Sequence, residues 1–263
     1  MSLRILLDVL EGQFVLSVSV VPLAKAVFQI QIPKHDLVLL FYCNLFANVV
    51  HQTVSIPSRV IHIDEDLFLQ KKAIIINRIS AALQRAQRIY ARNTQLSRIN
   101  KEEAIGFQQA YHLQVHLPGK YRYGLFYRDE LVAIAVFSSG RKMNDRPTNY
   151  RSFELLRFCQ QSNFLIVGGL SKLLKGMIRQ FHPGDIMTYV DRDWSNGEIY
   201  VQLGFNRSGS TSPQRFYIHG STGLRYDTKA YRELIVGDSA KQAKDFHTTE
   251  NLGSIKMHYR VEP

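Results

Sequence analysis

Residues 151–205 contain an ordered series of secondary-structure signals that strongly narrows the folds open to this 263-residue chain. The apolar segment FELLRFC (153–159) is typical of a strand, and it is followed by VGGLSKLL (167–174), in which two glycines precede a helical pattern. The strand-like segment DIMTYVD (185–191) and the segment EIYVQLGF (198–205) complete the series. Helices that alternate with strands pack on the faces of a sheet, so we expect one α/β unit here.

The glycine turn in this series predicts a site for a phosphate-bearing ligand. Backbone N–H groups of Val167–Lys172 would lie at the start of a helix, where the helix dipole also favours negative charge. Gly168 and Gly169 allow the backbone to approach a pyrophosphate closely, and Ser171 and Lys172 add a hydroxyl donor and a cation. The alternative is a plain loop that leads into a helix.

The segments FELLRFC, VGGLSKLLKG and TYVDRDWSNGEIYVQLGF together resemble the core of the GCN5-related N-acetyltransferase (GNAT) fold. The resemblance is greatest to the divergent C-terminal domain of phage homing-endonuclease-like proteins, and the phage DNA-modification protein Mom is more distantly similar. It covers residues 89–220, and more loosely extends from Val60 to the closing GSIKM. It implies an α/β (α+β) fold with a twisted mixed sheet flanked by helices. It also implies an N-acyltransferase that uses acetyl-CoA or another acyl-CoA, with an unidentified amine acceptor.

The same resemblance assigns coenzyme-binding roles to particular residues. The turn that anchors the pyrophosphate corresponds to Val167, Gly168, Gly169, Leu170, Ser171 and Lys172. The first Gly of the family's motif corresponds to Gly169 here. Three positions before it the family usually has Arg or Gln, whereas this chain has Ile166. Lys172 could compensate for that departure. The acyl carbonyl would be polarised by the backbone N–H groups of Phe158 and Cys159.

Four side chains are candidates for the acid–base chemistry of acyl transfer. Tyr200 matches the tyrosine that protonates the leaving thiolate in many members of the family, and a phenol is a fitting acid for that step. Packing against Phe205 is the alternative role. The candidates for the base are Glu154, His112 and Asp191, although His112 could instead pack or cap a helix and Asp191 could fix a turn.

The charge of the chain favours an acidic partner. Its formal net charge is +11, with an isoelectric point near 9.7. Lys71, Arg78 and Arg85 recur every seven residues in a predicted helix, where they would share one face and could follow a DNA backbone. A solvated helix face is the alternative. A non-catalytic nucleic-acid-binding module is therefore a second hypothesis, and a base-modifying enzyme would combine both.

Four consecutive zones are predicted along the chain: 1–66, rich in β-structure; 67–88, a basic amphipathic helix; 89–220, the acyltransferase-like domain; and 221–263, a polar tail with a possible last strand at Ser254–Tyr259. In the first zone, Val9–Val21, Ala26–Ile32 and Leu37–Leu40 suit strands. The stretch Asp36–His51 and the segment VIHIDEDLF are faintly similar to the end of a phage nuclease domain. The strand LVLLFYCNLF has no carboxylate for a catalytic metal, which predicts that any cutting activity has been lost.

Within 89–220 we predict the following elements: a strand at Ile89–Ile99, a helix at Lys101–Leu113 capped by Asn100, a hairpin of Tyr121–Tyr127 and Leu131–Phe137, a helix at Asn196–Leu203, and a strand at Arg215–Ile218 that closes the sheet.

Cysteine and histidine usage predicts a cytoplasmic protein without a metal site. The two cysteines do not suit a disulfide framework, and no Cys or His pair has metal-ligand spacing. Asp8 and Glu11 interrupt the apolar N-terminus, which does not suit a secretion signal. The longest apolar run, Leu37–Val50, is too short to cross a membrane.

Overall fold

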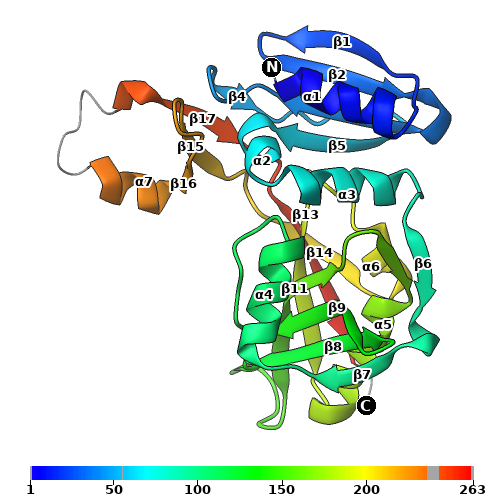
Figure 1. Ribbon diagram of the computed structural model, residues 1–263. Coiled ribbons are helices and arrows are strands. Elements are labelled where there is room, and N and C mark those ends of the chain that lie inside the picture. Colours follow the sequence, from blue (N-terminus) through cyan, green and yellow to red (C-terminus); the bar gives the residue numbers. More distant parts are fainter. Residues whose placement is uncertain (1, 55, 236–242, 262–263) are drawn as a thin grey trace. The chain divides into compact units, whose positions relative to one another are not determined.

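The structure is a computed structural model that describes residues 2–54, 56–235 and 243–261 (Figure 1). Its contacts divide the chain into two compact units, each assembled from separate stretches of sequence. Unit 1 comprises Met1–Lys72, Asp191–Asn196 and Ser210–Ser254, and unit 2 comprises Ala73–Val190, Gly197–Gly209 and Ile255–Pro263. This division differs from the four predicted consecutive zones, because the chain after residue 190 contributes to both units.

Unit 1 contains two four-stranded sheets, in the orders β1-β2-β3-β5 and β16-β15-β17-β4. In the first sheet β3 lies between β2 and β5 and all six of its residues are buried, as its apolar sequence predicts. The elements of unit 1 are α1 (Ser2–Asp8), a π-helical turn (Val9–Gln13), β1 (Ser19–Ala24), β2 (Val27–Ile32), β3 (Leu37–Tyr42), β4 (Val49–Val50), β5 (Arg59–Asp64), α2 (Glu65–Gln70), β15 (Arg215–His219), β16 (Arg225–Asp227), α7 (Thr228–Ile235) and β17 (Phe246–Glu250).

Two predictions for this part of the chain are wrong. The start of the predicted strand Val9–Val21 is helical, because Leu6 and Leu10 are both fully buried and a spacing of four places them on one helix face. The predicted strand Arg215–Ile218 exists as β15, but it pairs with β16 and β17 and does not close the large sheet. Strand propensity identifies a strand and does not identify its partners.

Unit 2 contains a large mixed sheet in the order β14-β18-β13-β11-β9-β8-β7, with the short β10 paired to β11. Strands β7 to β11 are antiparallel neighbours, and β11 and β13 are parallel. The elements of unit 2 are α3 (Lys72–Ala82), β6 (Gln87–Tyr90), β7 (Gln95–Arg98), α4 (Lys101–Tyr111), β8 (Tyr121–Tyr127), β9 (Glu130–Phe137), β10 (Arg141–Lys142), β11 (Arg151–Gln160), β12 (Phe164–Val167), α5 (Gly169–Phe181), β13 (Asp185–Asp191), α6 (Glu198–Gln202), β14 (Asn206–Ser210) and β18 (Ser254–Arg260).

Helices α4 and α5 cover opposite faces of this sheet (Figure 1). Alternate residues of β9 point to the two faces: Ile134 packs in a cluster with residues of α4, and Ala135 packs in a larger cluster with residues of α5. The predicted cap of α4 is confirmed, since Asn100 Oδ1 accepts a hydrogen bond from the Glu103 amide at 2.8 Å. The predicted mixed α/β class, with a mixed sheet flanked by helices, is therefore correct.

The predicted helix over 67–88 is shorter than expected. Lys71 separates α2 from α3, α3 ends at Ala82, and Gln84 adopts a positive φ of 59° that helices do not tolerate. Residues 87–90 then form β6, which pairs in parallel with β12. Similarly, the predicted strand Ile89–Ile99 is interrupted by a 3₁₀ turn at Ala91–Asn93.

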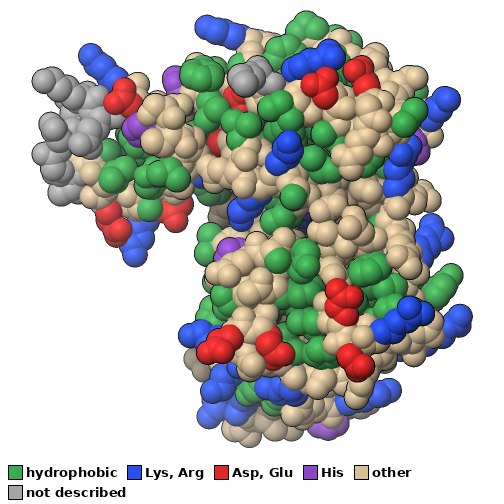
Figure 2. All heavy atoms as spheres, viewed as in Figure 1, with side chains coloured by type: hydrophobic (Ala, Val, Ile, Leu, Met, Phe, Trp, Pro, Cys, Tyr) green, Lys and Arg blue, Asp and Glu red, His purple; other side chains and the backbone are tan. Residues whose placement is uncertain are grey.

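The predicted basic face of that helix is consequently wrong. Of Lys71, Arg78 and Arg85, only Arg78 lies within a helix, because Lys71 precedes α3 and Arg85 follows it. On the face shown in Figure 2, Lys and Arg side chains are spread among acidic and hydrophobic ones. Among the described residues, every helix is too short or too polar to cross a membrane.

Candidate functional site

The parallel strands β11 and β13 of unit 2 separate partway along their length. They pair over three residues, with Ser152, Phe153 and Glu154 opposite Asp185, Ile186 and Met187. At the next position, the hydroxyl of Thr188 donates to the Leu155 carbonyl at 2.9 Å. A side-chain hydroxyl of β13 therefore donates the hydrogen bond that a backbone N–H of β13 would donate in a regular parallel ladder. This substitution marks the point where the two strands separate.

A β-bulge in β11 determines which backbone groups face β13. The register with β9 shifts between Leu155 and Arg157, so the side chains after the bulge reverse their facing. Phe158 then packs in the cluster of α5, and Cys159 in the cluster of α4. The bulge thereby determines that Phe158 faces α5 and Cys159 faces α4.

The N–H groups of these two residues also point in opposite directions. The Gln161 amide donates to the Val132 carbonyl of the β9 side at 2.9 Å, which identifies a hydrogen-bonded pair of the antiparallel ladder. Hydrogen-bonded and non-hydrogen-bonded pairs alternate along an antiparallel ladder. Cys159, two residues before Gln161 and opposite Ile134, therefore belongs to the next hydrogen-bonded pair, and its N–H points to β9. The N–H of Phe158 points to the other side, where β13 has separated. Phe158 is thus the better placed of the two predicted donors.

The predicted glycine turn connects β12 to α5. Gly168 is exposed and has φ +78°, a conformation that glycine adopts without strain, and it caps α5. A Cβ on Gly169 would lie 3.0 Å from Cβ of Ile166, so this position also requires a small residue. The first four N–H groups of a helix have no partner within it, and in α5 these belong to the turn Gly168–Ser171 and its flank. The turn therefore presents the N–H groups of a helix start, and anion binding at this position stays a prediction.

Lys172 is held by the chain itself. Its ammonium donates to the Ala91 carbonyl at 2.9 Å, to the Thr94 carbonyl, and to Thr94 Oγ1 at 3.4 Å. These contacts use the donors of the ammonium and tie α5 to the 3₁₀ turn Ala91–Asn93. In this structure Lys172 holds the turn, and its expected contact with a phosphate stays a prediction. Ile166 is buried in β12 opposite Ile89 of β6.

Tyr200 lies in α6 and is half-buried. Its ring packs edge-on against Phe205, with centroids 5.5 Å apart. Desolvation by burial raises the pKa of the Tyr200 phenol to about 12, and the charge of Arg78 lowers it slightly. The phenol is therefore protonated at neutral pH, which an acid requires, and the expected packing against Phe205 is also present.

The three predicted bases lie on different elements. Glu154 lies half-buried in the paired part of β11. His112 is the C-cap of α4, on the opposite face from α5, and its Nδ1 accepts from the Gln114 amide at 3.2 Å. Asp191 belongs to unit 1, where its Oδ1 accepts from the Asp193 amide at 3.0 Å. His112 and Asp191 thus cap local turns, as the alternatives in the sequence suggest.

Two residues that position the site have no signal in the sequence. Thr188 lies where the strands separate. Gln160 Oε1 accepts a hydrogen bond from the Ile166 amide at 2.5 Å, which fixes β12 against the end of β11. Both roles depend on the pairing of distant segments. Local sequence patterns therefore could not identify them.

No protein-family model matches the chain, and no curated protein is similar to it in sequence. Several solved structures are similar to part of it. A Corynebacterium glutamicum protein described as histone acetyltransferase HPA2 and related acetyltransferase has a TM-score of 0.32 and 13% identity, over 54% of this chain and 66% of that one. A GNAT family acetyltransferase from Elizabethkingia anophelis with acetyl-CoA bound has a TM-score of 0.37 and 11% identity, over 64% and 99%.

The ribosomal-protein-S18-alanine N-acetyltransferase of Escherichia coli has a TM-score of 0.39 and 14% identity, over 65% of this chain and 95% of that one. The chain thus spans just under two thirds of the first of these proteins and nearly all of the other two. At these TM-scores and identities, the likenesses carry no argument about the activity of this chain.

Proposed function

We propose that unit 2 is an acyl-CoA-dependent N-acyltransferase of the GNAT fold. The observation that carries this proposal is the separation of β11 from β13 after Glu154, in a unit whose helix α5 begins at an exposed glycine turn. Parted strands leave backbone donors of β11 without a neighbouring strand, and the turn adds the N–H groups of a helix start. A thioester that carries a pyrophosphate needs both kinds of donor.

The residues present fit such a coenzyme. Gly168 is exposed, and a Cβ there would meet only the Ala91 side chain, at 3.6 Å, so this side of the turn is open. The N–H groups of Gly168, Gly169, Leu170 and Ser171 would hold the pyrophosphate, and the Phe158 N–H would orient the acyl carbonyl. Acetyl-CoA or another acyl-CoA would supply the acyl group as a thioester.

Tyr200 would hold a proton on its hydroxyl oxygen and donate it to a departing thiolate. Its raised pKa keeps that proton in place across the neutral range. Of the three predicted bases, His112 caps a helix and Asp191 holds a turn, which leaves Glu154. It would accept the proton of the amine, directly or through a water molecule.

The acceptor is not specified by these residues. The net charge of +11 makes an acidic molecule the first class to screen, and DNA is one member of that class. The interrupted stripe of Lys71, Arg78 and Arg85 does not favour a dedicated DNA-binding face.

A pair of variants at Gly168 tests the coenzyme site. Asn and Asp both tolerate the left-handed conformation and are nearly identical in shape, so both variants should fold. Gly168→Asp places a carboxylate beside the proposed pyrophosphate, and we expect it to weaken acetyl-CoA binding about tenfold or more relative to Gly168→Asn, by Coulomb repulsion. Isothermal titration calorimetry measures both affinities. Equal affinities for the two variants, or no binding of millimolar acetyl-CoA to the unmodified protein, would contradict the proposal.

A further inference from the structure

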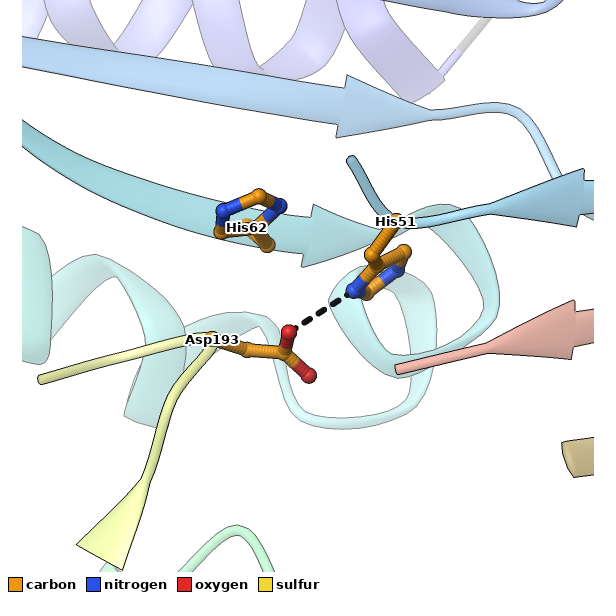
Figure 3. Close-up of side chains that lie close together, drawn as sticks. All are labelled: His51, His62 and Asp193. Atoms are coloured by element: carbon orange, nitrogen blue, oxygen red, sulfur yellow. Dashed lines mark hydrogen bonds and ion pairs between the residues drawn. The ribbon is translucent and has the colours of Figure 1, made fainter. Parts of the chain in front are cut away.

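Two histidines and one aspartate meet in the interior of unit 1 (Figure 3). His51 follows β4, His62 lies in β5, and Asp193 lies in the turn Asp191–Asn196. One potential ligand atom from each lies within 4.8 Å of the others, and the three residues are only 6%, 4% and 7% exposed. These side chains can bind a metal ion.

Backbone hydrogen bonds fix the three segments that carry these residues. The His62 amide donates to the Asp193 carbonyl at 2.9 Å, and the His51 amide donates to the Glu250 carbonyl at 2.8 Å. The Leu252 amide donates to Asp193 Oδ1 at 3.1 Å. Two of these hydrogen bonds are made by the backbone alone, and the third holds the Asp193 carboxylate itself in place.

Each imidazole has one nitrogen held by a second oxygen-bearing side chain. Nε2 of His51 lies 2.9 Å from Asp64 Oδ1, and Nδ1 of His62 lies 2.9 Å from the Tyr42 hydroxyl. Nδ1 of His51 faces Asp193 Oδ1, also at 2.9 Å. Metal-binding histidines are usually oriented in this way, with the second ring nitrogen bound to a carboxylate or another oxygen.

The charges of the surrounding cluster also suit a cation. Arg225 binds Asp64 at 2.6 Å and Asp66 at 2.7 Å, while Asp193 contacts His51. Arg192 also acts on His62, so with both imidazoles neutral these three carboxylates exceed the two guanidinium groups by one negative charge. Buried charges are costly unless they are compensated, and a bound cation would compensate this one.

We propose that His51, His62 and Asp193 bind a Zn²⁺ ion through three protein ligands, with a fourth position left for water, and that the ion joins the segment after β4, β5 and the turn Asp191–Asn196. Two imidazole nitrogens and one carboxylate oxygen suit this ion, whereas Mg²⁺ and Ca²⁺ prefer sites made only of oxygen. In tetrahedral coordination the ligand atoms lie about 3.3 Å apart, so His51 Nδ1 and Asp193 Oδ1, now 2.9 Å apart, would separate slightly to admit the ion. This site is independent of the coenzyme site proposed in unit 2, and it departs from the expectation of a chain without a metal.

A proton on His51 is the competing occupant of this position. An imidazolium would bridge Asp64 and Asp193 through its two N–H groups and would compensate the remaining negative charge. Zinc binding replaces the proton at Nδ1. Metal content therefore separates the two possibilities directly.

The test uses the full chain, treated with a chelator, dialysed and then titrated with Zn²⁺. We expect about one equivalent to bind, with visible absorption bands of tetrahedral coordination when Co²⁺ replaces Zn²⁺. Asp193→Asn keeps an oxygen acceptor for the Leu252 amide and removes the charge, and it should weaken Zn²⁺ binding at least tenfold. His182→Asn, at an exposed residue of unit 2 with φ 43°, is the matched control and should bind as the unmodified protein does.

Tyr42→Phe provides a second variant in case Asp193→Asn does not fold. It removes only the hydroxyl that orients His62, and we expect it to weaken Zn²⁺ binding between threefold and 100-fold, in line with the loss of a supporting hydrogen bond. Failure of the unmodified chain to bind Zn²⁺ would overturn the proposal and favour the imidazolium. Undiminished binding by both Asp193→Asn and Tyr42→Phe would also overturn it, because the ion would then lie elsewhere.

Discussion

Thr188 Oγ1 donates to the carbonyl of Leu155 at 2.9 Å, at the point where β11 and β13 part. Both residues are buried, at 3% and 2% exposure, so the hydroxyl is the group that satisfies this carbonyl in a place without bulk water. The strands separate here without leaving a backbone acceptor unpaired.

Replacement of Thr188 by Val tests this relationship. Thr188→Val keeps the shape and leaves the Leu155 carbonyl without its donor, so we expect the free energy of unfolding to fall by about 1–3 kcal/mol. Urea denaturation measures the change. Thr188→Ser keeps the hydroxyl and should lose less stability than the Val variant. If Val is tolerated better than Ser, the hydrogen bond does not stabilise the separated strands.

Removal of the Tyr200 hydroxyl tests the proposed acid. We expect Tyr200→Phe to lower kcat about 100-fold or more, as the loss of a general acid does, with little change in Tm because the ring still packs against Phe205. Tyr259 also packs against Phe205, so Tyr259→Phe is the matched control and should keep its rate. Equal rates for the two variants would remove Tyr200 from the mechanism.

Features set by a few neighbouring residues could be predicted from the sequence. The capping box of Asn100 and Glu103 starts α4 as expected, because both of its hydrogen bonds form within one turn. The hairpin of β8 and β9 turns at Arg128 and Asp129, which have φ values of 50° and 64°, at the position where the sequence predicts it. The glycine turn before α5 was identified for the same reason.

Features that depend on distant contacts could not be predicted in this way. Strand β15 has the expected residues, but the strand that accepts it comes from residues 246–250. His51 and Asp193 touch across 142 residues of sequence, so no spacing rule brings them together. The hydrogen bonds of Lys172 to Ala91 and Thr94 likewise follow from the packing of α5 on an earlier turn.

Burial predicts the reactivity of Cys159. Desolvation raises the pKa of its thiol to about 12, so the thiolate is scarce at pH 8. We expect iodoacetamide to leave Cys159 unmodified in the folded protein and to alkylate it in urea, as measured by mass spectrometry of the peptides. Rapid alkylation of the folded protein at pH 8 would contradict the burial of this side chain.

The same shift predicts a loss of stability at alkaline pH. The folded thiol keeps its proton up to about pH 12, whereas an unfolded thiol loses it near pH 9, so the unfolded state gains stability as the pH rises between these values. The contribution of Cys159 at pH 10 is about 1 kcal/mol. Cys159→Ala should therefore show a smaller difference in unfolding free energy between pH 8 and pH 10 than the unmodified protein does. An unchanged difference would mean that this thiol does not contribute.

Lys172 and Lys175 lie on the same helix and provide a matched pair for the last prediction. The ammonium of Lys172 binds carbonyls of Ala91 and Thr94, whereas Lys175 is exposed. Lys172→Met leaves these acceptors without their charged donor, so we expect the free energy of unfolding to fall by about 1–3 kcal/mol, and Lys175→Met to change it by less than about 0.5 kcal/mol. Urea denaturation of the two variants measures the difference. If both variants are equally stable and only Lys172→Met loses affinity for acetyl-CoA, the ammonium contacts the coenzyme and does not hold the turn.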